Sequence, residues 1–516
     1  MMLLKLSYVY LLLAFVAYVA ATLSPKAKDS LLQALRGTSL ENRQARLQNL
    51  GALYFKNMIG QGQQKGNFSS TTRTLPMDLI SNHVNDSSLE KINQREGVAD
   101  YLFQGDINLS EEQLDRIEKS LSANEASRAK RQVGRAATTW TYNYVYYYFD
   151  ASLSAVTFLA VRTYISVLRY TLFIVEPIPN CFLMLSLGTR KRNMVQMALN
   201  YIQARTCLQF VQSSVAANRI RVFSGSGCYS SVGMVGGEQQ LSLGDGCELI
   251  GIVAHEFMHA LGVWHMQMRD DRDSYVYIDL SSVPSNLHGN FVKLNSADVI
   301  NYNPYEYGST MHYDAVAFSS TNSYTILPYD TPYTRTIGSR TITFYDIKTI
   351  NDHYQCHAWC GAGSAVCLNG GEPNPRDCTI CNCPAGYGGA TCNQRPAGCG
   401  EALVATGLWQ VKQFTFGNAA VTTYRDSYME CNHRVQAPAG RRVQIRITSL
   451  NNAFCWHGCT TNSIEPKIRS DRRATNPRIC CSDMLNEVYT SVLNPTPIVS
   501  YNRYLTSTYT FHYRFI

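Results

Sequence analysis

The sequence predicts a multidomain chain, in which an α/β domain is followed by a small cysteine-rich module and an all-β sandwich. A helix-forming run carries His255, Glu256 and His259 in the first domain. Six cysteines fall between Cys360 and Cys392, a segment too short to fold without disulfide bonds. Beyond residue 399, segments such as 442–447 alternate polar and apolar residues, as half-buried strands do.

The run from His255 to His265 has the residue spacing of a catalytic zinc site. His255 and His259 are four residues apart, so they lie on one face of a helix. Glu256 is next to His255, close enough to reach a water on the metal without binding the metal itself. Gly262 can adopt a positive φ, which ends the helix and lets His265 close a third side. The fourth position stays open for water, as in catalytic rather than structural zinc sites.

A His-x-x-x-His pair alone is more often an ordinary surface pair than a metal site. The whole run, however, fits the metzincin pattern His-Glu-x-x-His-x-x-Gly-x-x-His. It continues through residues 266–273 as MQMRDDRD, and residues 309–313 further along are STMHY. These motifs resemble those of the astacin metalloproteases.

The resemblance implies a mixed twisted sheet and two long helices, the second of which bears the paired histidines. It also implies one Zn²⁺ per catalytic domain, with Glu256 as general base. Met311 would form an apolar floor below the metal, and Tyr313 would be a fifth ligand that swings away to stabilise the oxyanion. Met266 departs from the pattern, because astacins carry at this position a Glu that meets the amino terminus of the processed enzyme. That contact cannot form here in the usual way.

The first 131 residues predict a secreted, latent precursor. Residues 1–21 have one cation, an apolar stretch and small residues at the end, as a signal peptide does. A membrane anchor is the alternative, but the apolar run is short for one, and we expect no stable anchor. Residues 22–131 contain no cysteine and form the predicted propeptide. They hold the three glycosylation sequons of the chain, at Asn67, Asn85 and Asn108.

The propeptide ends in the basic sequence RAKR, so we predict cleavage at Arg131-Gln132 by a proprotein convertase or a trypsin-like protease. An ordinary solvated loop is the alternative interpretation. Upstream, Phe103-Gln104-Gly105-Asp106 resembles the Phe-x-Gly-Asp motif of astacin propeptides. The resemblance makes Asp106 the zinc ligand that keeps the precursor latent.

The 17 cysteines indicate an oxidising compartment. The astacin resemblance implies the pairs Cys207–Cys356 and Cys228–Cys247 in a catalytic domain spanning residues 132–357. Residues 358–393 resemble an EGF-like module, in which Cys383–Cys392 is the expected last bridge and the other pairings stay open; a zinc knuckle is the rival interpretation. Residues 399–516 resemble a CUB domain with a Cys399–Cys431 bridge, although any secreted sandwich would show the same alternation. Cys455 and Cys459 pair with Cys480 and Cys481 in some order.

Residues 155–189 interrupt the astacin pattern and contain Cys181, the one cysteine left without a partner. Our leading hypothesis is that this stretch is translated non-coding sequence. A membrane-leaning or substrate-covering insertion is the alternative.

The sequence as a whole predicts a secreted, extracellular metalloendopeptidase that acts on extracellular proteins. The net charge of +8 comes without a basic stripe interleaved with aromatic residues, so we expect no nucleic-acid binding. Astacins often favour acidic side chains just after the cut, and Arg335 is a candidate to bind them from its position in the chain. The alternative function is a catalytically impaired adhesion or matrix-binding protein that uses its EGF-like and CUB modules.

Overall fold

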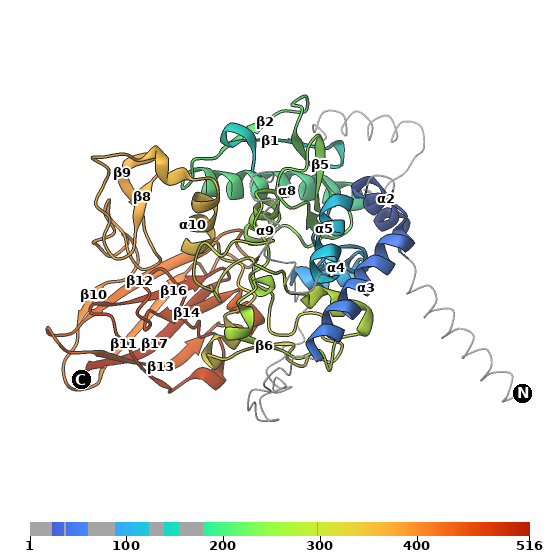
Figure 1. Ribbon diagram of the computed structural model, residues 1–516. Coiled ribbons are helices and arrows are strands. Elements are labelled where there is room, and N and C mark those ends of the chain that lie inside the picture. The colour runs from blue at the N-terminus through green and yellow to red at the C-terminus, as the bar shows by residue number, and fades with distance from the viewer. Residues whose placement is uncertain (1–22, 36–37, 60–87, 123–138, 154–178, 297) are drawn as a thin grey trace, which may run out of the picture.

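The computed structural model describes residues 23–35, 38–59, 88–122, 139–153, 179–296 and 298–516 (Figure 1). The predicted signal peptide, Asn67, Asn85 and the cleavage site at Arg131-Gln132 lie outside the described residues. Among the residues that are described, no helix is long and apolar enough to cross a membrane.

The predicted catalytic domain is built on a mixed sheet, as expected, and its five strands have the order β2-β1-β3-β5-β4. Its strands are β1 (Tyr144–Phe149), β2 (Gln209–Gln212), β3 (Arg219–Phe223), β4 (Cys228–Ser230) and β5 (Glu238–Leu243). Strand β4 is antiparallel to β5, whereas the other neighbours are parallel. This antiparallel strand forms one edge of the sheet, next to the predicted metal site.

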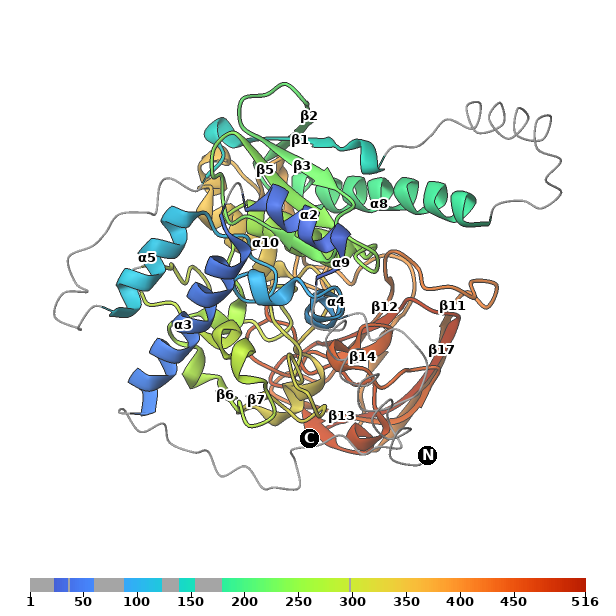
Figure 2. The same cartoon turned by 90° about the vertical axis from the view of Figure 1, so that its right-hand side faces the viewer.

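Two helices pack on one side of this sheet, α8 (Pro179–Gln203) and α9 (Ile250–Ala260) (Figure 2). Buried residues of both helices share one apolar core with β1, β3 and β5. All but the first residue of α9 are buried, which suits its apolar sequence IGIVAHEFMHA. The helix ends where Gly262 adopts a φ of +97°, so the predicted turn forms there.

Helix α8 begins at Pro179, inside the stretch 155–189 that interrupts the astacin pattern. The last residues of the predicted 155–189 insertion therefore form the first turns of α8. Cys181 lies in its first turn, among residues whose side chains the structure does not describe.

The chain beyond His265 forms a lower lobe with a second apolar core. Its regular elements are β6 (Val276–Ile278), β7 (Ile326–Pro328) and α10 (Phe344–His353), joined by 3₁₀ turns such as η8 (Ser285–Phe291). Strands β6 and β7 form a small antiparallel sheet. Residues Thr343 and Asp346 close a capping box at the start of α10.

The predicted propeptide, residues 22–131 and called the prosegment below, contributes four helices to the described residues: α2 (Pro25–Ala34), α3 (Leu40–Ile59), α4 (Leu89–Arg95) and α5 (Glu111–Ser122). They cover the side of the predicted catalytic domain opposite the hairpin of β8 and β9 (Figure 1), and α4 lies next to the C-terminal sandwich, because Ile92 and Arg95 line one pocket with Trp456 and Arg503. Buried residues of α3 and α5 share an apolar core with the lower lobe. The prosegment is therefore packed onto the enzyme domain.

The remainder of the chain is all β. The hairpin of β8 (Glu372–Asn374) and β9 (Asp377–Asn382) forms the cysteine-rich module. Two four-stranded sheets follow, in the orders β10-β12-β16-β14 and β11-β17-β13-β15. Their strands are β10 (Ala402–Val404), β11 (Gln410–Gly417), β12 (Met429–Gln436), β13 (Val443–Asn451), β14 (Asn462–Pro466), β15 (Val488–Thr490), β16 (Thr496–Asn502) and β17 (Thr506–Phe515). One apolar core joins the two sheets into a sandwich.

The structure contains the four disulfide pairs expected from the resemblances, Cys207–Cys356, Cys228–Cys247, Cys383–Cys392 and Cys399–Cys431. It also resolves the pairings that the sequence left open. In the small module, Cys360 pairs with Cys378 and Cys367 with Cys381. In the sandwich, Cys455 pairs with Cys481 and Cys459 with Cys480.

Candidate metal centre

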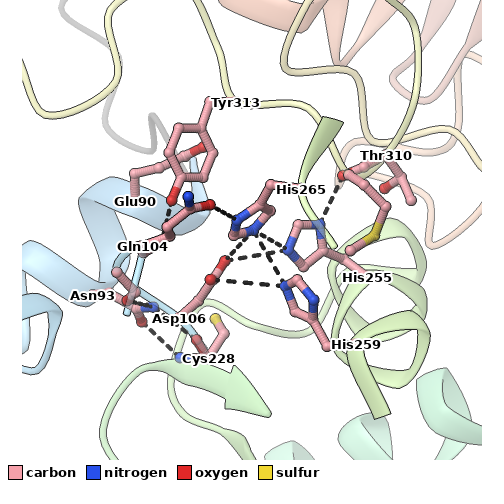
Figure 3. A network of polar contacts seen from close by, with 12 residues as sticks. Glu90, Asn93, Gln104, Asp106, Cys228, His255, His259, His265, Thr310 and Tyr313 are labelled. Atoms are coloured by element: carbon pink, nitrogen blue, oxygen red, sulfur yellow. Dashed lines mark hydrogen bonds and ion pairs between the residues drawn. The ribbon is translucent and has the colours of Figure 1, made fainter. Parts of the chain in front are cut away.

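Three imidazole rings and one carboxylate meet in a buried cluster between the two lobes (Figure 3). The Nε2 atom of His265 lies 3.2 Å from those of both His255 and His259. The Oδ2 atom of Asp106 lies 3.2 Å from Nε2 of His255 and 3.1 Å from Nε2 of His265. The four potential ligand atoms all lie within 4.8 Å of one another.

These separations match the donor arrangement of a tetrahedral metal ion. Zinc–nitrogen bonds of about 2.0–2.1 Å place neighbouring ligand atoms about 3.3–3.4 Å apart. Three inward-facing nitrogen lone pairs repel one another unless a cation lies between them. Three imidazoles with one carboxylate are also a donor set that zinc accepts. The residues therefore fit Zn²⁺.

The other nitrogen of each ring holds the imidazole in the orientation that metal binding needs. Nδ1 of His255 donates to the backbone oxygen of Thr310 over 2.8 Å, and Nδ1 of His259 donates to that of Val263 over 2.8 Å. Nδ1 of His265 donates to the side-chain oxygen of Gln104, also over 2.8 Å. With each Nδ1 carrying a proton, every Nε2 is free to bind a metal.

Glu256 is fully buried, and neither of its carboxylate oxygens has a hydrogen-bond partner among the described residues. Burial raises the pKa of Glu256 well above its usual range, and the negative charge of Asp106 raises it further. Asp106 differs, because contact with His265 and the other imidazoles holds its pKa well below the usual range although burial opposes this. A buried carboxyl group that has no partner beside a metal site is a candidate proton acceptor.

Met311 and Tyr313 both lie at the site, but Tyr313 is engaged elsewhere. Met311 is buried in the core that contains α9. The Tyr313 ring lies 4.8 Å from the His265 ring, and its hydroxyl donates to the backbone oxygen of Gln104. The prosegment thus holds the hydroxyl that was expected to assist catalysis.

Asp106 reaches the histidines because the prosegment pairs with the edge strand β4. The backbone nitrogen of Ser230 donates to the backbone oxygen of Asp106 over 3.0 Å. The backbone nitrogen of Asn108 donates to the backbone oxygen of Ser230 over 2.8 Å. Gly105 has a φ of +74°, and a Cβ there would lie 2.6 Å from the Phe318 ring. Only glycine fits this turn, which explains its place in the Phe-x-Gly-Asp motif.

The expectation of a glycan on Asn108 is wrong. The residue is only 5% exposed, and its side-chain nitrogen, the atom that would carry the glycan, donates to the backbone oxygen of Ala34 over 3.0 Å. A glycan on this buried nitrogen would break its contact with Ala34 of α2, inside the prosegment. The sequon is a local pattern and carries no information about burial.

Sequence reasoning missed a buried ion pair between Arg340 and Glu90 of the prosegment. Nη2 of Arg340 lies 3.5 Å from Oε2 of Glu90, and both side chains are buried. Burial raises the pKa of Glu90 to about 7, even though Arg340 opposes this. Arg340 also acts on Glu256, whose pKa its charge lowers. Arg335, the candidate from the sequence, instead pairs with Asp483 of the sandwich over 3.0 Å.

Met266 lies at the lobe junction, where its backbone nitrogen donates to the oxygen of Met311 over 2.9 Å. Its sulfur lies 3.9 Å from Nη1 of Arg269, and that arginine pairs with Asp271 over 2.7 Å. Met266 therefore packs as an apolar neighbour of the arginine.

Comparison with known proteins agrees with this geometry. The family model for the astacin peptidases, described as "Astacin", matches residues 177–355. The Caenorhabditis elegans protein "Zinc metalloproteinase nas-31" is 37% identical over 485 residues, which cover 92% of this chain and 73% of that protein. "Zinc metalloproteinase nas-17" from the same organism is 33% identical over 454 residues, which cover 87% of this chain and 94% of that protein. The chain therefore belongs to the astacin family of zinc metalloproteinases.

Two further matches differ in extent. "Zinc metalloproteinase nas-32" of C. elegans is 43% identical over 431 residues, which cover 83% of this chain and only 60% of that relative. Among solved structures, high choriolytic enzyme 1, a hatching enzyme zinc-protease from Oryzias latipes, is 29% identical with a TM-score of 0.33. That match covers 42% of this chain and 92% of the solved one.

Proposed function

We propose that this chain is the latent precursor of a secreted zinc-dependent endopeptidase that cleaves extracellular proteins. The observation that carries the proposal is the convergence of three imidazole nitrogens on one carboxylate of the prosegment, next to the carboxyl of Glu256, which has no hydrogen-bond partner in the described part of the chain. A binding scaffold has no physical need for that buried carboxyl group, whose burial without a partner is unfavourable.

His255, His259 and His265 would hold one Zn²⁺ per catalytic domain, with Asp106 as a further ligand in the precursor. When bound, zinc supplies Lewis-acid chemistry, which lowers the pKa of water and polarises a carbonyl group. Glu256 accepts the proton of the attacking water through its free oxygens and then delivers it to the leaving amine. The hydroxyl of Tyr313, once released from Gln104, donates to the oxyanion, a role worth about 10²–10³ in rate.

Latency follows from what the prosegment occupies. It places Asp106 at the histidines, binds the Tyr313 hydroxyl through Gln104 and pairs with the edge strand β4. An added strand at a sheet edge is a common way of binding a peptide substrate. Cleavage at Arg131-Gln132 by a proprotein convertase or trypsin-like protease would release all three contacts together.

We assign residues 1–21 as signal peptide, 22–131 as propeptide, 132–357 as catalytic domain, 358–393 as EGF-like and 399–516 as CUB-like, with glycans on Asn67 and Asn85.

The role of Glu256 is tested by Glu256→Gln in the processed protein. We expect zinc to stay bound and casein cleavage to fall by at least about 10²-fold, because the proton acceptor is lost. Glu238→Gln is the matched control, since Glu238 lies on β5 in an ion pair with Arg219 and should leave activity unchanged. Near wild-type cleavage by Glu256→Gln would contradict the proposal. An inert but zinc-loaded wild-type protein would favour the adhesion or matrix-binding alternative.

We also propose that Arg340 favours substrates with an acidic residue beside the cut. Loss of the prosegment removes Glu90 and leaves this buried guanidinium without the carboxylate it now faces. A substrate carboxylate would restore the pair. Arg340→Gln should lower kcat/KM for an acidic test peptide by roughly 10-fold or more and change that for its amide counterpart little. Equal losses for both peptides would contradict this assignment.

A further inference from the structure

The three metal-binding histidines differ in where their outer hydrogen-bond partners come from. His255 and His259 donate to backbone oxygens of Thr310 and Val263, which stay with the enzyme after processing. His265 donates to the side chain of Gln104, which leaves with the prosegment. Processing at Arg131-Gln132 therefore removes the outer partner of one ligand out of three.

His265 is also the ligand that most needs such a partner. His255 and His259 are anchored on the buried helix α9, whereas His265 follows the Gly262 turn and precedes a short 3₁₀ segment. An acceptor on the outer nitrogen fixes the tautomer and orientation of the ring and makes the inner nitrogen a stronger donor.

Gln104 is held rigidly enough to perform this task. It is buried, and its side-chain nitrogen donates to the backbone oxygen of Val292 over 2.8 Å. That bond turns the side-chain oxygen towards His265. The backbone oxygen of Gln104 accepts from the Tyr313 hydroxyl, which fixes the main chain as well (Figure 3).

We propose that Gln104 is a positioning residue for the metal and that the precursor is the form in which the enzyme acquires zinc. In the precursor the histidines have three outer partners and a fourth potential ligand, Asp106. The processed enzyme keeps two outer partners and gains the open position that catalysis requires. This inference rests on the proposed function and adds a second task for the prosegment, metal loading, to latency.

The test measures zinc affinity by competition with a chromophoric chelator, in precursors that carry Glu256→Gln so that self-cleavage cannot alter the samples. We expect Gln104→Leu to weaken zinc binding by about 10- to 100-fold, the usual effect of losing an outer-sphere partner. Gln104→Glu loses the bond to Val292 but keeps an acceptor oxygen for His265, so it should bind zinc more tightly than Gln104→Leu, which a purely structural role would not explain.

The matched control is Gln113→Leu. Gln113 is a second buried prosegment glutamine, and its side chain donates to the backbone oxygen of Val232 over 3.0 Å and accepts from the nitrogen of Ser110. Parent-like zinc affinity in this control supports the inference. Equal weakening in Gln104→Leu and Gln113→Leu, or no weakening in Gln104→Leu, would overturn it.

The proposed function fails by a different result. If the parent precursor binds no zinc, the peptidase proposal falls whatever Gln104 does. If the parent binds zinc and Gln104→Leu binds it equally well, the peptidase proposal stands and only the loading role is lost.

Discussion

The prosegment and the C-terminal sandwich both cover the catalytic domain, but they use different parts of it (Figure 1). The prosegment contacts groups needed for chemistry, namely the metal-binding histidines and the Tyr313 hydroxyl. The sandwich contacts the lower lobe through buried polar residues such as Arg478 and Thr475. Under the proposed function, the cover that uses the catalytic groups must leave before the enzyme can work, whereas the other cover can stay.

The sandwich interface shows how permanent attachment is built. Arg478 is buried and donates to Ser339 and Thr341 of the lower lobe, over 2.8 and 2.9 Å. The backbone nitrogen of Thr475 donates to the carboxyl of Glu306 over 3.1 Å. The contact is close, because a Cβ on Gly308 would overlap the Thr475 side chain. Through these buried hydrogen bonds the sandwich stabilises the lower lobe.

The largest expected effect comes from removing the prosegment's ligand. Asp106→Ala should make the uncleaved precursor active in a quenched-peptide assay, because water can then take the fourth position. Its rate should stay below that of the processed enzyme, since Gln104 still holds Tyr313, a donor worth about 10²–10³. Asp115→Ala removes a prosegment carboxylate that pairs with Arg46 and should stay silent. A silent Asp106→Ala precursor would contradict the latency assignment.

The second prediction concerns the sandwich. Arg478 and Glu465 form a buried ion pair, with Nε and Oε2 3.4 Å apart. Arg478→Leu leaves the buried Glu465 with Lys467 as its remaining cation and removes the hydrogen bonds to Ser339 and Thr341, so it should destabilise the protein by about 1.5–3 kcal/mol, measured by chemical denaturation. Zinc affinity of the folded protein should not change, because Arg478 has no contact with the histidines. Arg514→Leu, on the outer side of β17, should cost about 0.5 kcal/mol or less. Loss of zinc in Arg478→Leu would show that the two covers are coupled.

A third prediction is a pH dependence at the same interface. Burial raises the pKa of Glu306 from 4.5 to about 8, and the hydrogen bonds from Gly308 and Thr475 only partly oppose this. Between these pH values the folded protein holds a proton that the unfolded chain has released, so stability falls as the pH rises. Glu306→Gln stays neutral and should show a smaller loss of unfolding free energy over this range. Identical pH profiles for the two proteins would show that Glu306 does not titrate in this way.

The sequence alone predicted those site residues that lie close to one another along the chain. The spacing of His255, Glu256 and His259 fixes their arrangement on a helix, and the structure places His265 beside them after the Gly262 turn. The alternating strands of the C-terminal region likewise predicted the sandwich.

The contacts that depend on tertiary structure were out of reach. Gln104 meets His265 across 161 residues of chain, and nothing in its neighbourhood distinguishes it from other glutamines. The fold brings Glu90 to Arg340 and Asp483 to Arg335, and both carboxylates are distant in sequence from the arginines they pair with. The prediction of a glycan on Asn108 was wrong for the same reason. A sequon indicates that a glycan could be attached, but it does not indicate whether the asparagine side chain is exposed.

Metal analysis of the processed protein tests the three-histidine site itself. We expect one zinc per chain, retained in Glu256→Gln and lost in His259→Ala, with peptidase activity following the metal through chelation and restoration. A correctly folded, processed protein without bound zinc, or one that cleaves peptides equally well after its metal is removed, would contradict the site and the function assigned to it.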